Sequence, residues 1–267
     1  MTLEILICTF NDGIKRAAQV PFEPTHNISY LVSWQQGEGY EPCQLPEELK
    51  RDDVKVIQVK GRGLSVNRNH ALENATGDIC LIADDDITYL PNHVVHVVEY
   101  FESRPTLDVA SFKYASHANP KSYPSYSFDL RQKVKGYHLS SIEIAFRRTS
   151  VQGKLRFNEL FGINAPVLGA GEESVFALDA VNMGLNWFFF PYVIARHEHP
   201  TTSVRDGDAS AYLMSNGAYI YLAYKDGTAL PRCVLFAWRT SHNPIKFFKA
   251  LKAVFKGYAY IKEHASV

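Results

Sequence analysis

The sequence predicts an α/β fold with a mostly parallel central sheet, helices on both faces and a C-terminal helical segment. The chain has 267 residues, of which 46% are hydrophobic, so it is long and apolar enough to bury a sizeable core. Short continuous apolar runs, typical of buried parallel strands, alternate with helical stretches through the first half of the chain. This alternation favours an open sheet with right-handed crossovers.

The individual elements follow from local patterns. A helix is expected over 65–75 and ends at Thr76-Gly77-Asp78, because glycine adopts the left-handed conformation without steric cost. Pro91 suits the first turn of a second helix, which has a stripe of valines behind it. The predicted strands of the first half are residues 3–9, 28–33, 54–59, 79–83 and 108–114.

From about residue 116 the pattern changes to polar, aromatic and turn-forming residues, which indicates loops and antiparallel strands. An amphipathic helix is then expected over 172–183, ended by Gly184, followed by a buried strand in "LNWFFFPYVIARHEHP" (185–200). We expect three parts: residues 1–115, residues 116–205 of the same domain, and a helical extension over 206–267.

Charge and cysteine usage exclude several classes of protein. Lys and Arg number 28 and Asp and Glu number 28, and this balance argues against a nucleic-acid binder. The four cysteines have no metal-ligand spacing, and Cys8 and Cys80 sit in apolar runs, so we expect a reducing, cytoplasmic location. We expect no signal peptide, because the N-terminus lacks a basic leader, and no membrane span, because no apolar run reaches about 18 residues.

Three consecutive carboxylates, Asp84, Asp85 and Asp86, end the apolar run 79–83. In open α/β sheets ligands bind at the carboxyl ends of the strands. Clustered carboxylates there suit a hard divalent cation, which would neutralise the charge of phosphates. The alternative is a solvated helix N-terminus, where Asp is favoured by the helix dipole.

A glycine- and arginine-containing segment precedes the acidic strand. Gly61 and Gly63 would let the backbone approach a ligand, and Arg68 suits an anionic diphosphate. Alternatively, Arg68 forms a structural ion pair with Glu73 or Asp78.

Two later motifs also carry candidate side chains. Glu172 and Glu173 open a predicted helix after "GAG", where a carboxylate could be a general base or only a favourable first-turn residue. His197 and His199 end a predicted strand and face the same side, so one of them could complete a metal site or both could be surface residues.

The C-terminal stretch 243–264 predicts a basic amphipathic helix. Its apolar stripe could pack on the domain, or it could dock on an anionic membrane surface. The stripe consists of Phe247, Leu251, Val254, Tyr258 and Ile261.

Together these pieces resemble the family 2 inverting glycosyltransferases, which have the GT-A fold. The resemblance covers roughly residues 3–205 and consists of six motifs in the family's order. They read "CTFN" (8–11), "GLSVNRN" (63–69), "LIADDD" (81–86), "FNELF" (157–161), "GEESVF" (171–176) and "RHEHPTTS" (196–203).

The resemblance implies a role for each motif. Glu173 would be the catalytic base, supported by Glu172. Asp86 would bind the metal ion, Mn²⁺ or Mg²⁺. Asp84 would either share the metal or contact the ribose of the nucleotide. His197 would contact the metal or the diphosphate, with His199 as the second choice. The implied nucleotide-sugar-binding residues are Thr9, Phe10, Asn11, Gly63, Arg68, Asn69, Asp84 and Asp85.

The implied function is metal-dependent transfer of a sugar from a nucleotide-sugar donor to a hydroxyl of a glycan or lipid-linked acceptor in cell-surface polysaccharide synthesis. A UDP-sugar is the first choice of donor. The first part of the chain, 1–115, would bind the donor and 116–205 the acceptor, with peripheral contact to the inner membrane face through 243–264. The sequence departs from the family pattern in two places. The segment "SWQQGEG" stands where the family has an acidic residue that helps hold the nucleotide base, and Glu173 stands where Asp is commoner. The alternatives are a nucleotidyltransferase and a catalytically inactive nucleotide- or carbohydrate-binding module.

Overall fold

The computed structural model describes residues 1–265 except 117–119, 133, 135–136, 198–208 and 242–243. It divides into two compact units. The first contains residues 1–62, 66–156 and 179–200, and the second contains residues 63–65, 157–178 and 201–267.

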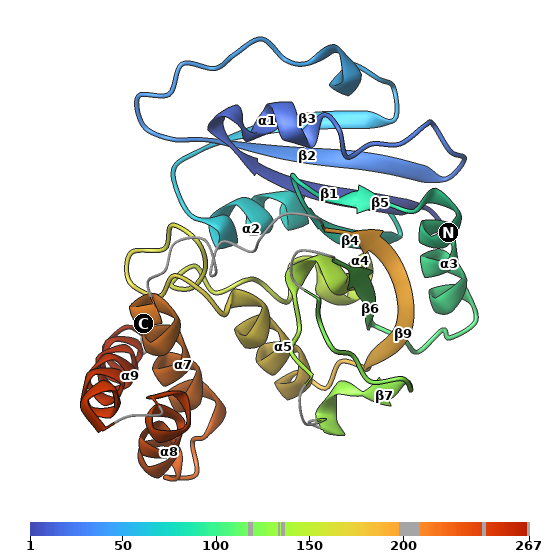
Figure 1. Ribbon diagram of the computed structural model, residues 1–267. Helices are drawn as coiled ribbons and strands as arrows, with labels where there is room; N and C mark the ends of the chain where they lie inside the picture. The colour runs from blue at the N-terminus through green and yellow to red at the C-terminus, as the bar shows by residue number, and fades with distance from the viewer. Residues whose placement is uncertain (117–119, 133, 135–136, 198–208, 242–243, 266–267) are drawn as a thin grey trace. The chain divides into compact units, whose positions relative to one another are not determined.

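The first unit is built on a nine-stranded sheet in the described residues, with the order β3-β2-β1-β4-β8-β6-β9-β5 and with β7 paired to β9 (Figure 1). The strands β1, β2, β3 and β4 are parallel, as predicted, whereas β8 is antiparallel to both of its neighbours. The bounds are β1 Leu3–Phe10, β2 Ile28–Gln36, β3 Val54–Lys60, β4 Ile79–Asp84, β5 Thr88–Tyr89, β6 Val109–Ala115, β7 Phe128–Asp129, β8 Ile144–Arg147 and β9 Trp187–Arg196.

The helices of the first unit cover this sheet. Pro91 is the first residue of α3, as predicted, and α3 packs against β9 (Figure 1). The helices and 3-10 turns are η1 Asn11–Gly13, α1 Ile14–Ala17, η2 Glu47–Leu49, α2 Leu64–Asn74, α3 Pro91–Glu102, η3 Leu130–Gln132, η4 Ser141–Glu143 and α4 Arg148–Val151. The helix α5, Glu172–Asn182, runs across the boundary between the units, and α2 begins at it.

The core of the first unit is formed by the central strands. Every residue of β1 except Phe10 is buried, which explains why its sequence is largely apolar. The Glu4 carboxylate in this strand accepts hydrogen bonds from the Thr76 and Gly77 backbone N–H groups. Cys8 and Cys80 are buried free cysteines, as expected for small core residues. Burial raises the pKa of the Cys8 thiol to about 12, so this thiol stays protonated and unreactive.

Within its described residues, the second unit contains three C-terminal helices, α7 Ala209–Ala223, α8 Ala229–Ser241 and α9 Pro244–His264. A Cβ atom on Gly217 would lie 1.9 Å from the Val254 carbonyl oxygen, and one on Gly257 would lie 1.8 Å from the Met214 carbonyl oxygen. The two glycines therefore allow the backbones of α7 and α9 to touch where the helices cross.

The apolar stripe of α9 packs inside this unit. Val254 and Ile261 are fully buried, and Phe247, Leu251 and Tyr258 pack against the same helical cluster. Of the two alternatives that the sequence left open for this stripe, packing against the protein and docking on a membrane, the structure shows packing. Within the described residues, no helix combines the length and the hydropathy that a membrane crossing requires.

Candidate active site

The carboxyl ends of β1, β2 and β4 meet at one edge of the sheet. Cys8 of β1 lies opposite Asp84 of β4, and Phe10 lies opposite Gln35 of β2. The predicted donor-site residues at the ends of β1 and β4 are therefore neighbours in space, as the fold class requires of a ligand site.

Asp85 is held by protein groups on both sides. The Thr9 hydroxyl donates a hydrogen bond of 2.6 Å to its Oδ2, and the Arg16 guanidinium lies 3.0 Å from both carboxylate oxygens. Burial raises the pKa of Asp85, and the Thr9 and Arg16 contacts oppose this rise. A Cβ on Gly13 would lie 2.3 Å from Asp85 Oδ2, so glycine leaves room for the contact. In this arrangement Asp85 links β1 and α1 to the end of β4.

Asp84 is paired with Arg68, whose guanidinium Nη2 lies 3.0 Å from Oδ1. The same nitrogen donates a hydrogen bond of 2.6 Å to the Ser141 hydroxyl, and Arg68 is only 2% exposed. Of the two alternative partners, Glu73 pairs with Arg156, and Asp78 accepts hydrogen bonds from Thr2. Arg68 therefore fixes the orientation of Asp84 at the strand end.

Asp86 lies beside His197, with 3.2 Å between its Oδ1 and the His197 Nε2. The pairing of β5 with β9, in which Thr88 lies opposite Arg196, brings the two residues together across 111 positions of sequence. His197 is 7% exposed, whereas 26% of the Asp86 side chain is exposed. His199, the second choice at this site, lies outside the described residues.

The chemistry of this pair fits a divalent cation. Carboxylate oxygen and imidazole nitrogen are both ligands of Mn²⁺-type ions. In the described residues, no three His, Cys, Asp or Glu side chains gather closely enough to hold a metal by themselves. Mg²⁺-type sites commonly use one or two carboxylates and complete their coordination with water and substrate phosphates, so a full protein cage is not required.

The loop after β1 is held by Asn11, which has a positive φ of 49°. Its side-chain oxygen accepts a hydrogen bond of 2.9 Å from the Gly37 backbone N–H, and its carbonyl accepts one of 2.8 Å from the Trp34 indole. Phe10, the last residue of β1, lies beside Gly37, since a Cβ on Gly37 would be 2.9 Å from its ring. These contacts join the loop that follows β1 to the loop that follows β2.

Several polar groups at this edge were not found by sequence reasoning. Asn67 donates a hydrogen bond of 2.9 Å to the Thr9 carbonyl, while its own Oδ1 has no hydrogen-bond partner. The amide nitrogens of Gln35 and Gln36 are also buried without a partner. Buried polar groups need a partner, which a donor or an ordered water would supply. The sequence signal was present in "SWQQGEG", but only as a departure from the family pattern.

Of the other predicted binding residues, Asn69 is buried, at 2% exposure. Gly63 has a φ of 116°, a conformation that side-chain-bearing residues rarely adopt. Gly63 belongs to the second unit and Asn69 to the first.

The two predicted catalytic carboxylates lie in the second unit, at the start of α5. Glu172 is 6% exposed, and a Cβ on Gly162 would lie 3.3 Å from its carboxyl group. Gly162 has a φ of 104°, so the loop 157–162 needs glycine here both for its conformation and for space. Glu173 is partly exposed, so it is the more accessible of the two carboxylates.

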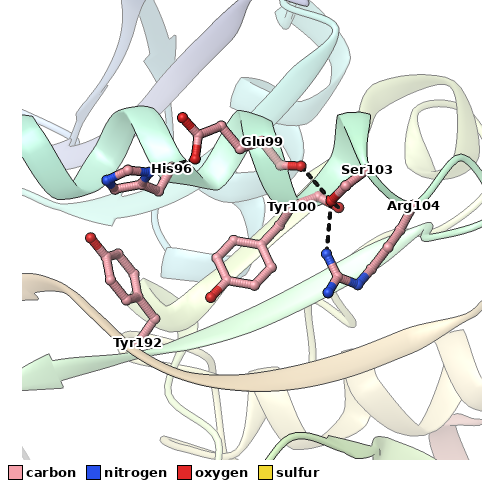
Figure 2. Close-up of a pocket in the computed structure, with 6 residues that line it drawn as sticks. All are labelled: His96, Glu99, Tyr100, Ser103, Arg104 and Tyr192. Atoms are coloured by element: carbon pink, nitrogen blue, oxygen red, sulfur yellow. Dashed lines mark hydrogen bonds and ion pairs between the residues drawn. The ribbon is translucent and has the colours of Figure 1, made fainter.

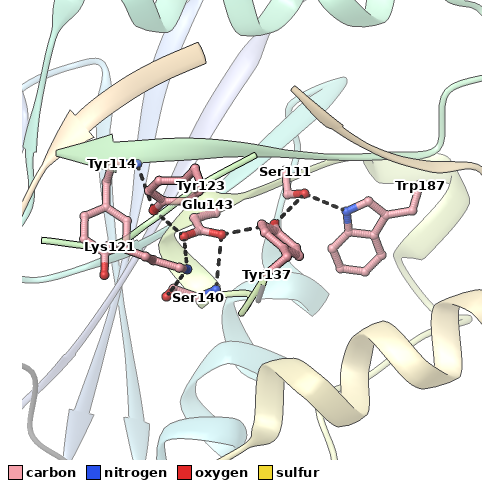
Figure 3. A network of polar contacts seen from close by, with 8 residues as sticks. All are labelled: Ser111, Tyr114, Lys121, Tyr123, Tyr137, Ser140, Glu143 and Trp187. Atoms are coloured by element: carbon pink, nitrogen blue, oxygen red, sulfur yellow. Dashed lines mark hydrogen bonds and ion pairs between the residues drawn. The ribbon is translucent and has the colours of Figure 1, made fainter. Parts of the chain in front are cut away.

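A buried polar network in the first unit surrounds Glu143, which is fully buried (Figure 3). Its carboxylate pairs with Lys121 and accepts hydrogen bonds from Tyr123 (2.7 Å) and Tyr137 (3.2 Å). Burial raises the pKa of Glu143, and the Lys121 ammonium opposes this rise. No motif in the sequence marks these residues, because they come from the polar, turn-rich stretch.

A pocket of about 270 Å³ lies next to this network. Tyr114 lines it, and the Tyr114 ring also packs edge-on against His197 at 6.0 Å. The pairing of β6 with β9 shifts register at Lys113, and both Lys113 and Tyr114 reach the Tyr123 ring. The full lining is Lys113, Tyr114, Ala115, Ser116, Pro120, Lys121, Tyr123 and Val193.

Another pocket of about 270 Å³ lies between α3 and β9 (Figure 2). None of the predicted site residues lines it. Its lining is His96, Glu99, Tyr100, Ser103, Arg104 and Tyr192.

The mostly parallel α/β sheet with its acidic strand end has a GT-A-like fold. Residues 40–161 match the family model of Glycosyl transferase family 2. The chain carries a Glycosyl transferase family 2 domain and is a glycosyltransferase. No curated protein sequence matches the chain.

Solved structures give the same fold. Residues 1–349 of S. aureus TarS match with a TM-score of 0.58 and 14% identity, over 97% of this chain and 81% of that one. The complex of TarS 1–349 with UDP-GlcNAc matches with a TM-score of 0.57 and 14% identity, over 97% and 82%. The mannosyltransferase PcManGT from Pyrobaculum calidifontis, in complex with GDP-Man and Mn²⁺, matches with a TM-score of 0.51 and 14% identity, over 99% and 74%. At these identities the likeness shows the fold alone.

Proposed function

We propose that this glycosyltransferase is metal-dependent and inverting, and that it transfers a sugar from a nucleotide-sugar donor to a hydroxyl of a glycan or lipid-linked acceptor in cell-surface polysaccharide synthesis. The observation that carries the proposal is the pair formed by Asp86 and His197 at the end of β4 and β9. The donors in the two similar structures, UDP-GlcNAc and GDP-Man, support a nucleotide sugar, and the Mn²⁺ in the second supports a cation.

On this proposal, Asp86 and His197 hold the cation, and Asp84, oriented by Arg68, contacts the ribose or shares the cation. The cation would supply charge neutralisation for the departing nucleoside diphosphate. Thr9, Phe10 and Asn11 line the nucleoside side of the site. The unpartnered amide of Gln35 supports a hydrogen bond to the base, in place of the missing acidic residue.

Glu173 is the proposed catalytic base. Its carboxylate takes the proton of the acceptor hydroxyl, whose oxygen bonds to the anomeric carbon on the face opposite the leaving group. The bond from the anomeric carbon to the diphosphate oxygen breaks, and this single displacement inverts the configuration. Glu172, which is buried, supports the first turn of α5, which carries Glu173. Acceptor groups approach through the pocket that Lys113 and Tyr114 line, since Tyr114 packs on His197.

The test begins with a panel of nucleotide sugars, each added with Mn²⁺, to find the donor that raises the melting temperature. Turnover of that donor is then compared in Glu173→Gln and Glu172→Gln. Glu173→Gln should keep donor binding and lose about two to four orders of magnitude in turnover, as typical for loss of a general base. Normal turnover in Glu173→Gln would show that the base is another residue.

The reaction products separate the alternatives. A glycosyltransferase releases a nucleoside diphosphate, a nucleotidyltransferase releases pyrophosphate or consumes it, and an inactive binding module releases neither. Release of a nucleoside diphosphate only with a divalent cation is the expected result.

A further inference from the structure

The helix α8 has its small residues inside and its large apolar residues outside. The face that packs within the second unit consists of Ala229, Cys233, Ala237 and Ser241, which are all buried. The outward residues Leu230, Val234 and Trp238 follow at intervals of four and are 49%, 42% and 62% exposed. A surface helix normally shows the reverse arrangement, because burying large apolar side chains is favourable.

Two further side chains extend this surface. Leu235 of α8 is 45% exposed, and Phe248 of α9 is 67% exposed. The Trp238 ring packs edge-on against Phe247, the neighbour of Phe248, with 5.6 Å between ring centroids. The Phe247 and Phe248 rings also contact each other, so Trp238 and Phe248 share a neighbour. We define the α8–α9 patch as Leu230, Val234, Leu235, Trp238 and Phe248.

The charge around the patch favours an anionic partner. Residues 229–264 contain seven Lys and Arg and one Glu, which gives a net charge of +6 in a chain whose net charge is zero. Lys249, Lys252 and Lys256 of α9 are all exposed and recur at helical spacing just after Phe248. Lysine next to exposed aromatic and aliphatic side chains suits the boundary between an anionic lipid headgroup layer and its acyl chains. Tryptophan is likewise enriched at this boundary.

We propose that the α8–α9 patch docks the protein on an anionic membrane surface, with Trp238 and Phe248 inserted at the headgroup level and the lysines of α9 facing the lipid phosphates. The patch differs from the stripe that the sequence suggested, since the stripe on α9 is packed against α7 and α8. The proposal does not depend on the sugar-transfer chemistry, because docking requires neither donor nor acceptor.

The test is co-sedimentation of the full chain with vesicles of phosphatidylcholine alone or of phosphatidylcholine mixed with phosphatidylglycerol. Wild type should bind the mixed vesicles, bind the neutral ones much more weakly, and lose affinity as salt is raised. Trp238→Gln with Phe248→Gln should lower affinity for mixed vesicles by about tenfold or more. Replacing Lys249, Lys252 and Lys256 by Gln should lower it by about fivefold for each charge removed and weaken the salt dependence.

Matched controls lie in the first unit, where Tyr126 is 56% exposed and Lys55 is exposed. Tyr126→Gln and Lys55→Gln should leave vesicle binding unchanged. Circular dichroism and the melting temperature check that each variant is folded, which is expected because every altered side chain is exposed.

Two outcomes would overturn the proposal. One is wild-type binding that is absent, or equal for neutral and anionic vesicles. The other is a wild-type dimer, found by sedimentation velocity, that Trp238→Gln converts to a monomer without any change in vesicle binding, because the patch would then be an interface between copies of the chain.

Discussion

The contact between Thr9 and Asp85 should contribute more to stability than the ion pair between Arg16 and Asp85. Thr9 is 3% exposed and donates at 2.6 Å to a carboxylate that is 13% exposed. A hydrogen bond to a charged group contributes about 1.5–3 kcal/mol, and its loss leaves the Asp85 carboxylate with the exposed Arg16 guanidinium as its side-chain donor. The Arg16 side chain is 60% exposed, so its pair contributes only about 0–1 kcal/mol.

The assay is urea unfolding at neutral pH, followed by tryptophan fluorescence. Thr9→Val should lower the free energy of unfolding by about 1.5–3 kcal/mol and Arg16→Gln by no more than about 1 kcal/mol. Thr25→Val is the matched control, because the Thr25 hydroxyl bonds only to the Glu23 carbonyl at the surface. The reasoning fails if Arg16→Gln costs more than Thr9→Val, or if Thr9→Val costs no more than Thr25→Val.

Two other variants test the packing and the buried charge. Gly217→Ala should lower the free energy of unfolding by about 1–3 kcal/mol, although alanine is the better helix former, because its Cβ would overlap the Val254 carbonyl of α9. Asn216→Ala is the control on the same helix. If Gly217→Ala lowers the free energy of unfolding by no more than Asn216→Ala does, the close crossing of α7 and α9 is contradicted. For Glu143, a folded-state pKa raised by burial means that ionisation disfavours the folded state, so the stability of wild type relative to Glu143→Gln should be greatest below about pH 4.5 and fall as pH rises through the raised pKa. Melting temperatures of the two proteins across this range measure the difference, and a relative stability that increases with pH would show that the Lys121 pairing outweighs burial.

The strands were predictable because their signal is local. A buried parallel strand such as β1 or β4 is a mostly apolar run, and its neighbours in a βα alternation follow from the fold class. The antiparallel position of β8 between β4 and β6 was not predictable, because strand order depends on pairing between distant segments. The sequence indicated antiparallel strands in this region, but it did not indicate which strands they pair with.

The same distinction applies to the candidate site. The acidic triplet is a local signal, but the partner of each aspartate is not. Arg68 was expected to pair with Glu73 or Asp78 if it was structural, and it pairs with Asp84 across the strand end. The network around Glu143 and the α7–α9 crossing were missed for the same reason, since each depends on residues that only the tertiary fold brings together.

The central claim is that Asp86 and His197 hold a cation that a nucleotide sugar requires. Calorimetric titration of the donor selected from the nucleotide-sugar panel, with and without Mn²⁺, into wild type and Asp86→Asn tests it most directly. We expect binding to wild type only with Mn²⁺, and an affinity at least about tenfold lower in Asp86→Asn, since a charged ligand to the cation is lost. Equal donor affinity in both proteins, unaffected by Mn²⁺, would contradict it.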